Sequence, residues 1–139
     1  MTANRLVRDV MAPEVRTIEE SRKLSDVRKL LVKHSFHHVP IVSDNKLVGI
    51  ISANDMVRLT CDTYGTDERS MDNVLDRHFS IDQVMNRNVI TIKGDATIRE
   101  AAMLLGNGTF HSLPVIDADG AVVGIITSTD LIRLLTEED

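Results

Sequence analysis

The length, composition and charge of the chain exclude several kinds of protein. With 139 residues, of which 42% are apolar and 27% charged, the chain can bury one ordinary core beneath a polar surface. Its net charge of −5 and its lack of Trp argue against a surface for nucleic acid or for an anionic membrane.

The chain also lacks the usual marks of export. No apolar run approaches the roughly 18 residues that cross a bilayer. The first residues, MTANRLVRDVM, have no long apolar core like that of a signal peptide. The single Cys61 cannot form an internal disulfide, so nothing indicates an oxidising compartment. We therefore expect a cytoplasmic protein without a membrane segment.

The first predicted elements alternate strand and helix. VRTI at 15–18 is rich in β-branched residues and predicts a short extended segment. Apolar residues at helical spacing predict a helix over about 23–34. HVPIV at 38–42 and LVGIIS at 47–52 are joined by the polar turn SDNK, which is typical of a hairpin. A second helix is expected over about 53–60.

The segment after this helix differs in composition. Residues 62–80, DTYGTDERSMDNVLDRHFS, are polar and acidic and resemble no other part of the chain. We interpret them as a linker that contains one short helix. A solvated connection is the interpretation we favour over a docking site.

The second half of the chain repeats the first order of elements. VITI at 89–92 predicts a short extended segment, and the capping-box spacing of Thr97 and Glu100 opens a helix over about 97–107. LPVI at 113–116 and VVGIIT at 122–127 predict a hairpin. A closing helix is expected over about 128–136.

An internal alignment shows that the two halves are copies. At an offset of 74, Val10-Met11 falls on Val84-Met85, and one extra turn residue changes the offset to 75 in the VGII segments. This indicates a duplication, with the first repeat at 1–61, the linker at 62–80 and the second repeat at 81–139. The predicted fold class is α+β, with two β-α-β-β-α repeats that form one compact module about a pseudo-twofold axis.

The phrase GIISAND closes the first hairpin, and GIITSTD closes the second. In each phrase a hydroxyl residue is followed three positions later by an aspartate: Ser52 by Asp55, and Thr127 by Asp130. This is the spacing of a capping box, in which both side chains satisfy backbone N–H groups at the start of a helix. On this interpretation the phrase is architecture, and its glycine relieves crowding in the hairpin.

A second interpretation uses the same geometry for binding. The start of a helix presents unpaired N–H groups and the positive end of its dipole, and a carboxylate there can accept two hydrogen bonds from the diol of a ribose. Arg58 and Arg133 follow the two aspartates by three positions and can neutralise phosphate. Each repeat thus offers groups that suit an adenine, a ribose and a phosphate.

The order and repetition of these motifs resemble a tandem pair of CBS domains, the module named after cystathionine β-synthase. The matching motifs are VM before VxTI, the segments FHHVPIV and FHSLPVI, and GIISANDMVRL and GIITSTDLIRL. The resemblance implies a non-catalytic regulatory module that binds AMP, ADP, ATP or S-adenosylmethionine in clefts between the repeats. It also implies a homodimer and, as a possible further partner, an unidentified regulated protein.

The resemblance also implies the residues of two clefts, each shared by both repeats. Cleft one would use Val15, Arg16, Thr17, Phe36, His37, His38, Ile125, Thr127, Asp130 and Arg133. Cleft two would use Val89, Ile90, Thr91, Phe110, His111, Ser112, Ile50, Ser52, Asp55 and Arg58. Arg16 and His38 of cleft one align with Ile90 and Ser112, so we expect cleft one to bind phosphate more tightly.

Other functions find less support in the sequence. His34, His37 and His38 lie close together, but no Cys pair or HxxxH helix accompanies them, and we expect no metal site. Cys61 falls at a helix end, where the dipole disfavours a thiolate, and no nucleophile motif is present, so we expect no enzyme activity. The alternative that stays open is a ligand-free module for dimerisation or protein interaction.

Overall fold

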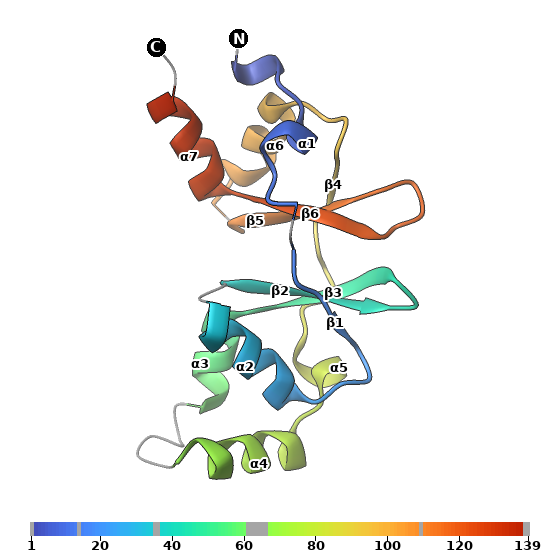
Figure 1. The fold of residues 1–139 in the computed structure, drawn as a ribbon, viewed down its shortest axis with the longest axis vertical. Helices are drawn as coiled ribbons and strands as arrows, with labels where there is room; N and C mark the ends of the chain where they lie inside the picture. Colours follow the sequence, from blue (N-terminus) through green and yellow to red (C-terminus); the bar gives the residue numbers. More distant parts are fainter. Residues whose placement is uncertain (1, 14, 35–36, 61–66, 109, 138–139) are drawn as a thin grey trace. The chain divides into compact units, whose positions relative to one another are not determined.

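A computed structural model describes residues 2–13, 15–34, 37–60, 67–108 and 110–137 of the chain. These residues form two compact units (Figure 1). Unit 1 combines residues 1–15 with residues 89–139, whereas unit 2 is the continuous segment 16–88. Each unit has its own sheet and its own apolar core.

Unit 2 contains a three-stranded sheet in the order β1-β2-β3. Strand β1 runs parallel to β2, and β2 runs antiparallel to β3. The elements in chain order are β1 (Ile18–Glu19), α2 (Leu24–His34), β2 (His38–Ser43), β3 (Lys46–Ser52), α3 (Ala53–Thr60), α4 (Glu68–His78) and α5 (Ile81–Val84). The two-residue turn Asp44-Asn45 has positive φ at both positions, as the tight primed hairpin turns require.

Unit 1 repeats this plan with a sheet in the order β4-β5-β6. Its elements are the 3-10 helix η1 (Thr2–Asn4), α1 (Val7–Val10), β4 (Ile92–Lys93), α6 (Ile98–Leu105), β5 (Ser112–Ile116), β6 (Val122–Thr127) and α7 (Ser128–Glu137). Strand pairing is again parallel and then antiparallel. The predicted α+β class and the repeated β-α-β-β-α order are therefore confirmed.

The first strand of each repeat is shorter than the sequence indicates. Pairing begins only where Ile18 lies opposite Ile41, and in the second repeat where Ile92 lies opposite Val115. Among the described residues, 15–17 and 87–91 belong to no strand. β-Branched side chains favour an extended backbone, but a strand also needs a neighbour for its hydrogen bonds.

The compact units do not coincide with the sequence repeats, because the short helices α1 and α5 each belong to the unit that the other repeat mainly forms. The residues after α1 pair with the second repeat: the Ala12 N–H donates to the Ile125 carbonyl at 3.0 Å, and Ile125 returns the bond at 3.2 Å. The residues after α5 pair with the first repeat through Ile50 and Asn86, at 3.0 and 2.9 Å. Each VM motif therefore packs on the VGII strand of the other repeat.

This exchange explains the glycine in each repeated phrase. A Cβ atom on Gly124 would collide with the Met11 side chain, and a Cβ on Gly49 would collide with Met85. The crowding that the glycine relieves thus comes from the methionine of the VM motif and not only from the hairpin. Two motifs that lie far apart in the sequence are parts of one contact.

The segment predicted as a solvated linker contains a docked helix. Asp67 caps α4 by accepting a hydrogen bond from the Ser70 N–H at 2.8 Å, and this bond lowers the pKa of Asp67. Leu75 is 1% exposed and belongs to the core of unit 2. The helix is amphipathic, with few apolar residues. Of the polar residues that indicated a linker, Asp72 and Asp76 face α2 and bond Arg28 and Ser25, and others lie on the outer face.

Candidate functional site

The start of α3 and the start of α7 have the same hydrogen-bond arrangement. In unit 2 the Asp55 carboxylate accepts from the Ser52 N–H at 2.9 Å, and the Asp55 N–H donates to the Ser52 hydroxyl at 3.1 Å. In unit 1 the Thr127 and Asp130 bonds have the same lengths, 2.9 and 3.1 Å. Both phrases therefore form the reciprocal capping box that their spacing predicts.

The capping hydrogen bonds use only part of the acceptor capacity of each aspartate carboxylate. The N–H of the hydroxyl residue occupies Oδ2 of each aspartate, whereas an ionised carboxylate can accept about four hydrogen bonds in all. Asp55 is also 3.8 Å from the guanidinium of Arg58, through its Oδ1 atom. The architectural and binding interpretations of the phrase are thus compatible, because one carboxylate can serve both.

Each unit places the residues before its central strand next to its own capping box. His38 lies opposite Ser52 in the β2–β3 register, and the Ala53 N–H donates to the His37 carbonyl at 2.8 Å. In unit 1, Ser112 lies opposite Thr127, and the Ser128 N–H donates to His111 at 3.0 Å.

The two predicted clefts draw on both units, so the sets as wholes stay predictions. Cleft one takes Val15, Ile125, Thr127, Asp130 and Arg133 from unit 1 and Arg16, Thr17, His37 and His38 from unit 2. Phe36 lies outside the described residues. Cleft two takes Val89 and Ile90, Thr91, Phe110, His111 and Ser112 from unit 1 and Ile50, Ser52, Asp55 and Arg58 from unit 2, with Val89 as the first residue of its unit-1 segment.

A pocket of 430 Å³ in unit 2 adds residues that sequence reasoning missed. Asp55, Arg58 and Leu59 of α3 line it together with residues from the end of α4 and from α5: His78, Phe79, Gln83 and Val84. His78 gives this pocket a second basic side chain, and Phe79, 38% exposed, gives it an aromatic surface. The sequence does not indicate that His78 and Phe79 lie near Asp55. Residues 62–80 belong to neither repeat, so the repeat alignment could not place them beside Asp55.

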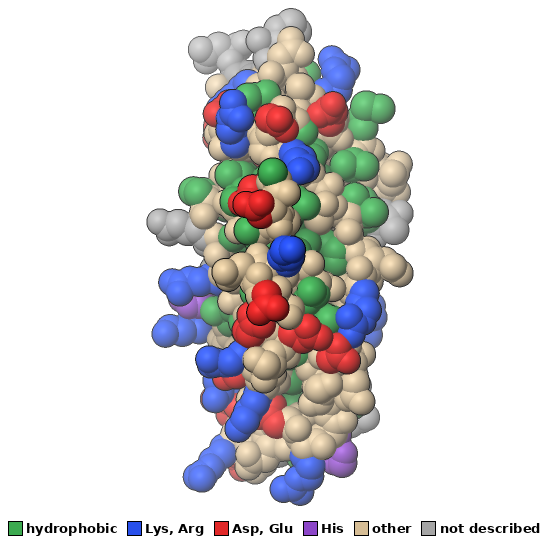
Figure 2. Space-filling view, turned by 90° about the vertical axis from the view of Figure 1, so that its right-hand side faces the viewer, with side chains coloured by type: hydrophobic (Ala, Val, Ile, Leu, Met, Phe, Trp, Pro, Cys, Tyr) green, Lys and Arg blue, Asp and Glu red, His purple; other side chains and the backbone are tan. Residues whose placement is uncertain are grey.

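The described residues supply no sign of other kinds of site. No group of three or more His, Cys, Asp and Glu side chains is placed to hold a metal ion in the part of the chain that the structure describes. None of the described helices is long and apolar enough to cross a membrane. Figure 2 shows acidic and basic side chains among one another along one face, with apolar side chains between them.

The repeated plan, the paired capping boxes and the VM–VGII contacts can be compared with known families. A family model described as the CBS domain matches residues 7–61 and again residues 81–137. The chain belongs to the CBS domain family. As a CBS-domain pair, it carries one match in each repeat, and the segment between the matches is the one that contains α4.

Several curated relatives are much longer proteins. The chain is 29% identical to a homoserine O-acetyltransferase of Methanohalobium evestigatum over 132 residues, which cover 94% of this chain and 24% of that protein. It spans 47% of MJ1225 of Methanocaldococcus jannaschii, an uncharacterized protein, at 28% identity. The chain therefore matches only a quarter to a half of these relatives, and their names describe the whole proteins.

Two solved structures match over almost the full length of both chains. The CBS domain pair of protein MJ0100, solved in complex with 5′-methylthioadenosine and S-adenosyl-L-methionine, is 29% identical with a TM-score of 0.80 over 98% of this chain and 99% of that one. CBSX2 of Arabidopsis thaliana, solved in complex with AMP, is 25% identical with a TM-score of 0.78, over 96% and 98% of the two chains.

Proposed function

We propose that this CBS-domain pair is a regulatory module that binds an adenosine-containing ligand and catalyses no reaction. The observation that carries the proposal is the duplicated capping box, because each of its aspartates keeps acceptor capacity beyond the cap. The complexes of MJ0100 with S-adenosyl-L-methionine and of CBSX2 with AMP support it. AMP, ADP, ATP and S-adenosylmethionine are the ligands that we would test first.

The chemistry divides among three kinds of group. Asp55 or Asp130 accepts from the ribose hydroxyls, the neighbouring hydroxyl residue holds the ligand at the helix start, and Arg58 or Arg133 meets the phosphate. At Asp55 the same pocket adds His78 and Phe79. We expect the site with Asp130 to bind the ligand more tightly than the site with Asp55. The predicted set with Asp130 includes the basic residues Arg16 and His38, whereas the set with Asp55 has Ile90 and Ser112 at the aligned positions.

A thermal-shift panel tests the proposal directly. A ligand at 100 times its Kd should stabilise the chain by about 2.7 kcal/mol. Adenine nucleotides and S-adenosylmethionine should raise Tm more than guanine nucleotides do, and incubation should leave each compound chemically unchanged. If no adenosine compound shifts Tm, the ligand-free interaction module becomes the better description.

Replacing aspartate by asparagine separates binding from capping. In Asp130→Asn the side-chain carbonyl can still accept from the Thr127 N–H, but the charge that attracts the ribose hydroxyls is lost. We expect the tighter binding event in titration calorimetry to weaken about tenfold, from the roughly 1.5–3 kcal/mol of a charge-assisted hydrogen bond, at nearly unchanged Tm. Asp55→Asn is the matched variant and should affect only the weaker event.

We also propose that the chain forms a homodimer through helix surfaces. Val32 of α2 and Val57 of α3 are each 63% exposed, which is costly for a monomer in water. Obligate interfaces bury roughly 2,000 Å² or more. Light scattering should give a dimer at micromolar concentration, and Val57→Glu should weaken it. A monomeric wild-type chain under these conditions would refute this part of the proposal.

A further inference from the structure

His78 and Phe79 connect α4 to α5 beside α3. Helix α4 ends at His78, and the Phe79 N–H donates to the Leu75 carbonyl at 2.8 Å. Leu75 and Ile81, which flank this connection, are 1% and 0% exposed. The core of unit 2 therefore anchors both ends of the connection, and its two side chains are held at the pocket that also contains Asp55.

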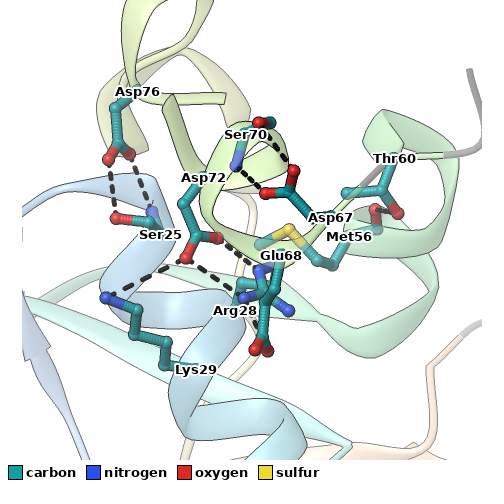
Figure 3. Close-up of polar contacts among 10 residues, drawn as sticks. All are labelled: Ser25, Arg28, Lys29, Met56, Thr60, Asp67, Glu68, Ser70, Asp72 and Asp76. Atoms are coloured by element: carbon teal, nitrogen blue, oxygen red, sulfur yellow. Dashed lines mark hydrogen bonds and ion pairs between the residues drawn. The ribbon is translucent and has the colours of Figure 1, made fainter. Parts of the chain in front are cut away.

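Polar contacts with α2 hold α4 just before this connection. Asp76 accepts from both the N–H and the hydroxyl of Ser25, at 2.9 and 2.6 Å (Figure 3). One turn earlier, Asp72 accepts from the Nε of Arg28. A helix that belongs to neither sequence repeat is thus fixed on the first repeat, and His78 comes with it to the pocket.

Three side chains of the pocket carry N–H donors, namely Arg58, His78 and Gln83. The carbonyl oxygen of Gln83 accepts from the Ser80 N–H at 3.1 Å, so its NH₂ group is the end left for a ligand. The Arg58 side chain is 80% exposed and lies 3.8 Å from Asp55, and an ion pair this exposed contributes little. The guanidinium gains more from a phosphate, which it can meet with two parallel hydrogen bonds.

Acceptors are few in the same pocket. Among the described residues that line it, Asp55 is the only acidic one. The Oδ2 atom of Asp55 already accepts from the Ser52 N–H, so the remaining acceptor capacity suits one diol. Leu59 and Val84 add apolar surface. A ligand with a diol and an anionic group therefore fits the pocket better than one with a diol and a cationic group.

We propose that His78 and Gln83, together with Arg58, make the pocket of Asp55 selective for phosphorylated adenosine ligands over S-adenosylmethionine. The two ligand classes share adenosine and differ at its 5′ carbon, which carries either a phosphate or a sulfonium cation. A phosphate offers three acceptor oxygens to the three donors, whereas the guanidinium repels a sulfonium. This inference rests on the proposed function and adds the ligand class and two residues that the CBS resemblance does not include.

Methyl NMR titrations of the full chain read this pocket separately from the site with Asp130. The methyl signals of Leu59 and Val84 report the pocket in unit 2, and those of the aligned Leu134 and Val10 report unit 1. At the unit 2 signals, the Kd for AMP should be about tenfold lower than the Kd for adenosine, as expected for charge-assisted hydrogen bonds to the phosphate. It should also be lower than the Kd for S-adenosylmethionine.

A charge added at Gln83 gives the sharpest test. Gln83→Glu keeps the capping-box spacing with Ser80, but it places a carboxylate where an amide group donates. The preference for AMP over adenosine should shrink from about tenfold to about twofold or less. The preference for AMP over S-adenosylmethionine should shrink further, because the sulfonium gains a nearby carboxylate. A merely structural role of Gln83 would change all three affinities alike.

His78→Asn copies the aligned Asn4 of unit 1 and removes the imidazole. It should reduce the preference for AMP over adenosine to about threefold. Arg77→Gln is the matched control, because Arg77 is exposed in the last turn of α4 and does not line the pocket. The control should keep the wild-type preference. Equal losses in the two variants would show that the charge of α4, and not a contact of His78, sets the affinity.

Other results would also overturn the inference. One is a Kd for AMP at the Leu59 and Val84 signals that is no lower than that for adenosine or S-adenosylmethionine. Another is a preference for AMP that Gln83→Glu leaves unchanged. If AMP moves only the Leu134 and Val10 signals, the proposed function holds and this inference fails. If no adenosine compound moves either set of signals, both fail.

Discussion

Units 1 and 2 agree in their binding geometry and differ in what covers their helices. The capping boxes of α3 and α7 have equal bond lengths, and both phrases receive a methionine from the other repeat against their glycine. In contrast, α4 packs on α2 and α3 in unit 2, while in unit 1 the short η1 is the described element that packs on α6 at the equivalent place. Duplication has thus preserved the helix starts and allowed the outer helix faces to diverge.

The packing of α4 on α2 explains why Arg28 in unit 2 differs from its counterpart in unit 1. Arg28 is buried because Asp72 accepts from its Nε at 2.5 Å and Glu68 from its terminal nitrogen at 3.0 Å. The hydrogen bond that Arg28 donates to Asp72 raises the pKa of Arg28 above its usual value. Its counterpart is Ala102, and the described residues that line a pocket beside Ala102 include no acidic side chain. A difference between repeats can therefore report a neighbour that only one of them has.

The largest expected effect comes from breaking the pair that holds α4. Arg28→Ala leaves Asp72, which is 13% exposed, without its main partner. Removing one member of a buried ion pair costs about 3–5 kcal/mol in the free energy of unfolding. Urea unfolding is the measurement, and Lys29→Ala is the control, because Lys29 is exposed and lies 3.9 Å from the same carboxylate. An Arg28→Ala cost as small as that of the control would contradict the comparison.

The double variant Arg28→Leu/Asp72→Leu sharpens this result. It converts the polar contact between α2 and α4 into an apolar one. Apolar replacement of a buried pair is often neutral or stabilising by about 1–4 kcal/mol. We therefore expect the double variant to regain most of the stability that Arg28→Ala loses. A double variant that is as unstable as the single one would show that α4 needs its charges for docking.

Glycine replacement tests what the units share. Gly124→Ala and Gly49→Ala should each destabilise by about 1–3 kcal/mol, because the added methyl group overpacks against Met11 or Met85. The cost of Gly124→Ala should fall in a Met11→Ala background. Unequal effects at the two glycines, measured by thermal unfolding, would mean that the two VM–VGII contacts are not equivalent.

A smaller effect is expected from copying one helix cap. Thr97 accepts from the Glu100 N–H at 3.2 Å to start α6, whereas Lys23 stands at the aligned position before α2. The Lys23 N–H already donates to Asp26 at 3.1 Å, so half of a capping box is present. Lys23→Thr should complete it and add about 0.5–1 kcal/mol. Thr97→Ala is the converse variant and should lose a similar amount.

The smallest expected effect is a loss of local stability of α4 at acidic pH. The hydrogen bonds of Asp67 at the start of α4 lower its pKa, the backbone bond from Ser70 most of all. The stabilisation is therefore complete above the ordinary aspartate range near pH 4 and is lost as the pH falls through the lowered pKa. Hydrogen exchange of α4 should accelerate there more than that of α7. Asp67→Asn, which cannot titrate, should reduce this difference.

What the sequence could predict is what is encoded locally. Ser52 and Asp55 are three residues apart, so their capping box could be inferred from spacing alone, and the duplication confirmed the order of elements. Arg28 and Asp72 are 44 residues apart, and no pattern in the acidic segment indicates that they meet. Likewise, nothing local shows that Met85 packs on Gly49 or that His78 shares a pocket with Asp55. Long-range contacts of single residues leave no periodicity to detect.

The reciprocal packing of α1 and α5 has a consequence for synthesis. Unit 2 is one continuous segment and can fold as soon as Asn88 has left the ribosome. Unit 1 starts with residues 1–15 and must wait for residues 89–139, so its first segment is held unfinished while the whole of unit 2 is made. Closing that gap costs less entropy once the intervening chain is already compact, since the effective loop is shorter. The order of translation therefore favours unit 2 as the earlier folding unit and unit 1 as the later one.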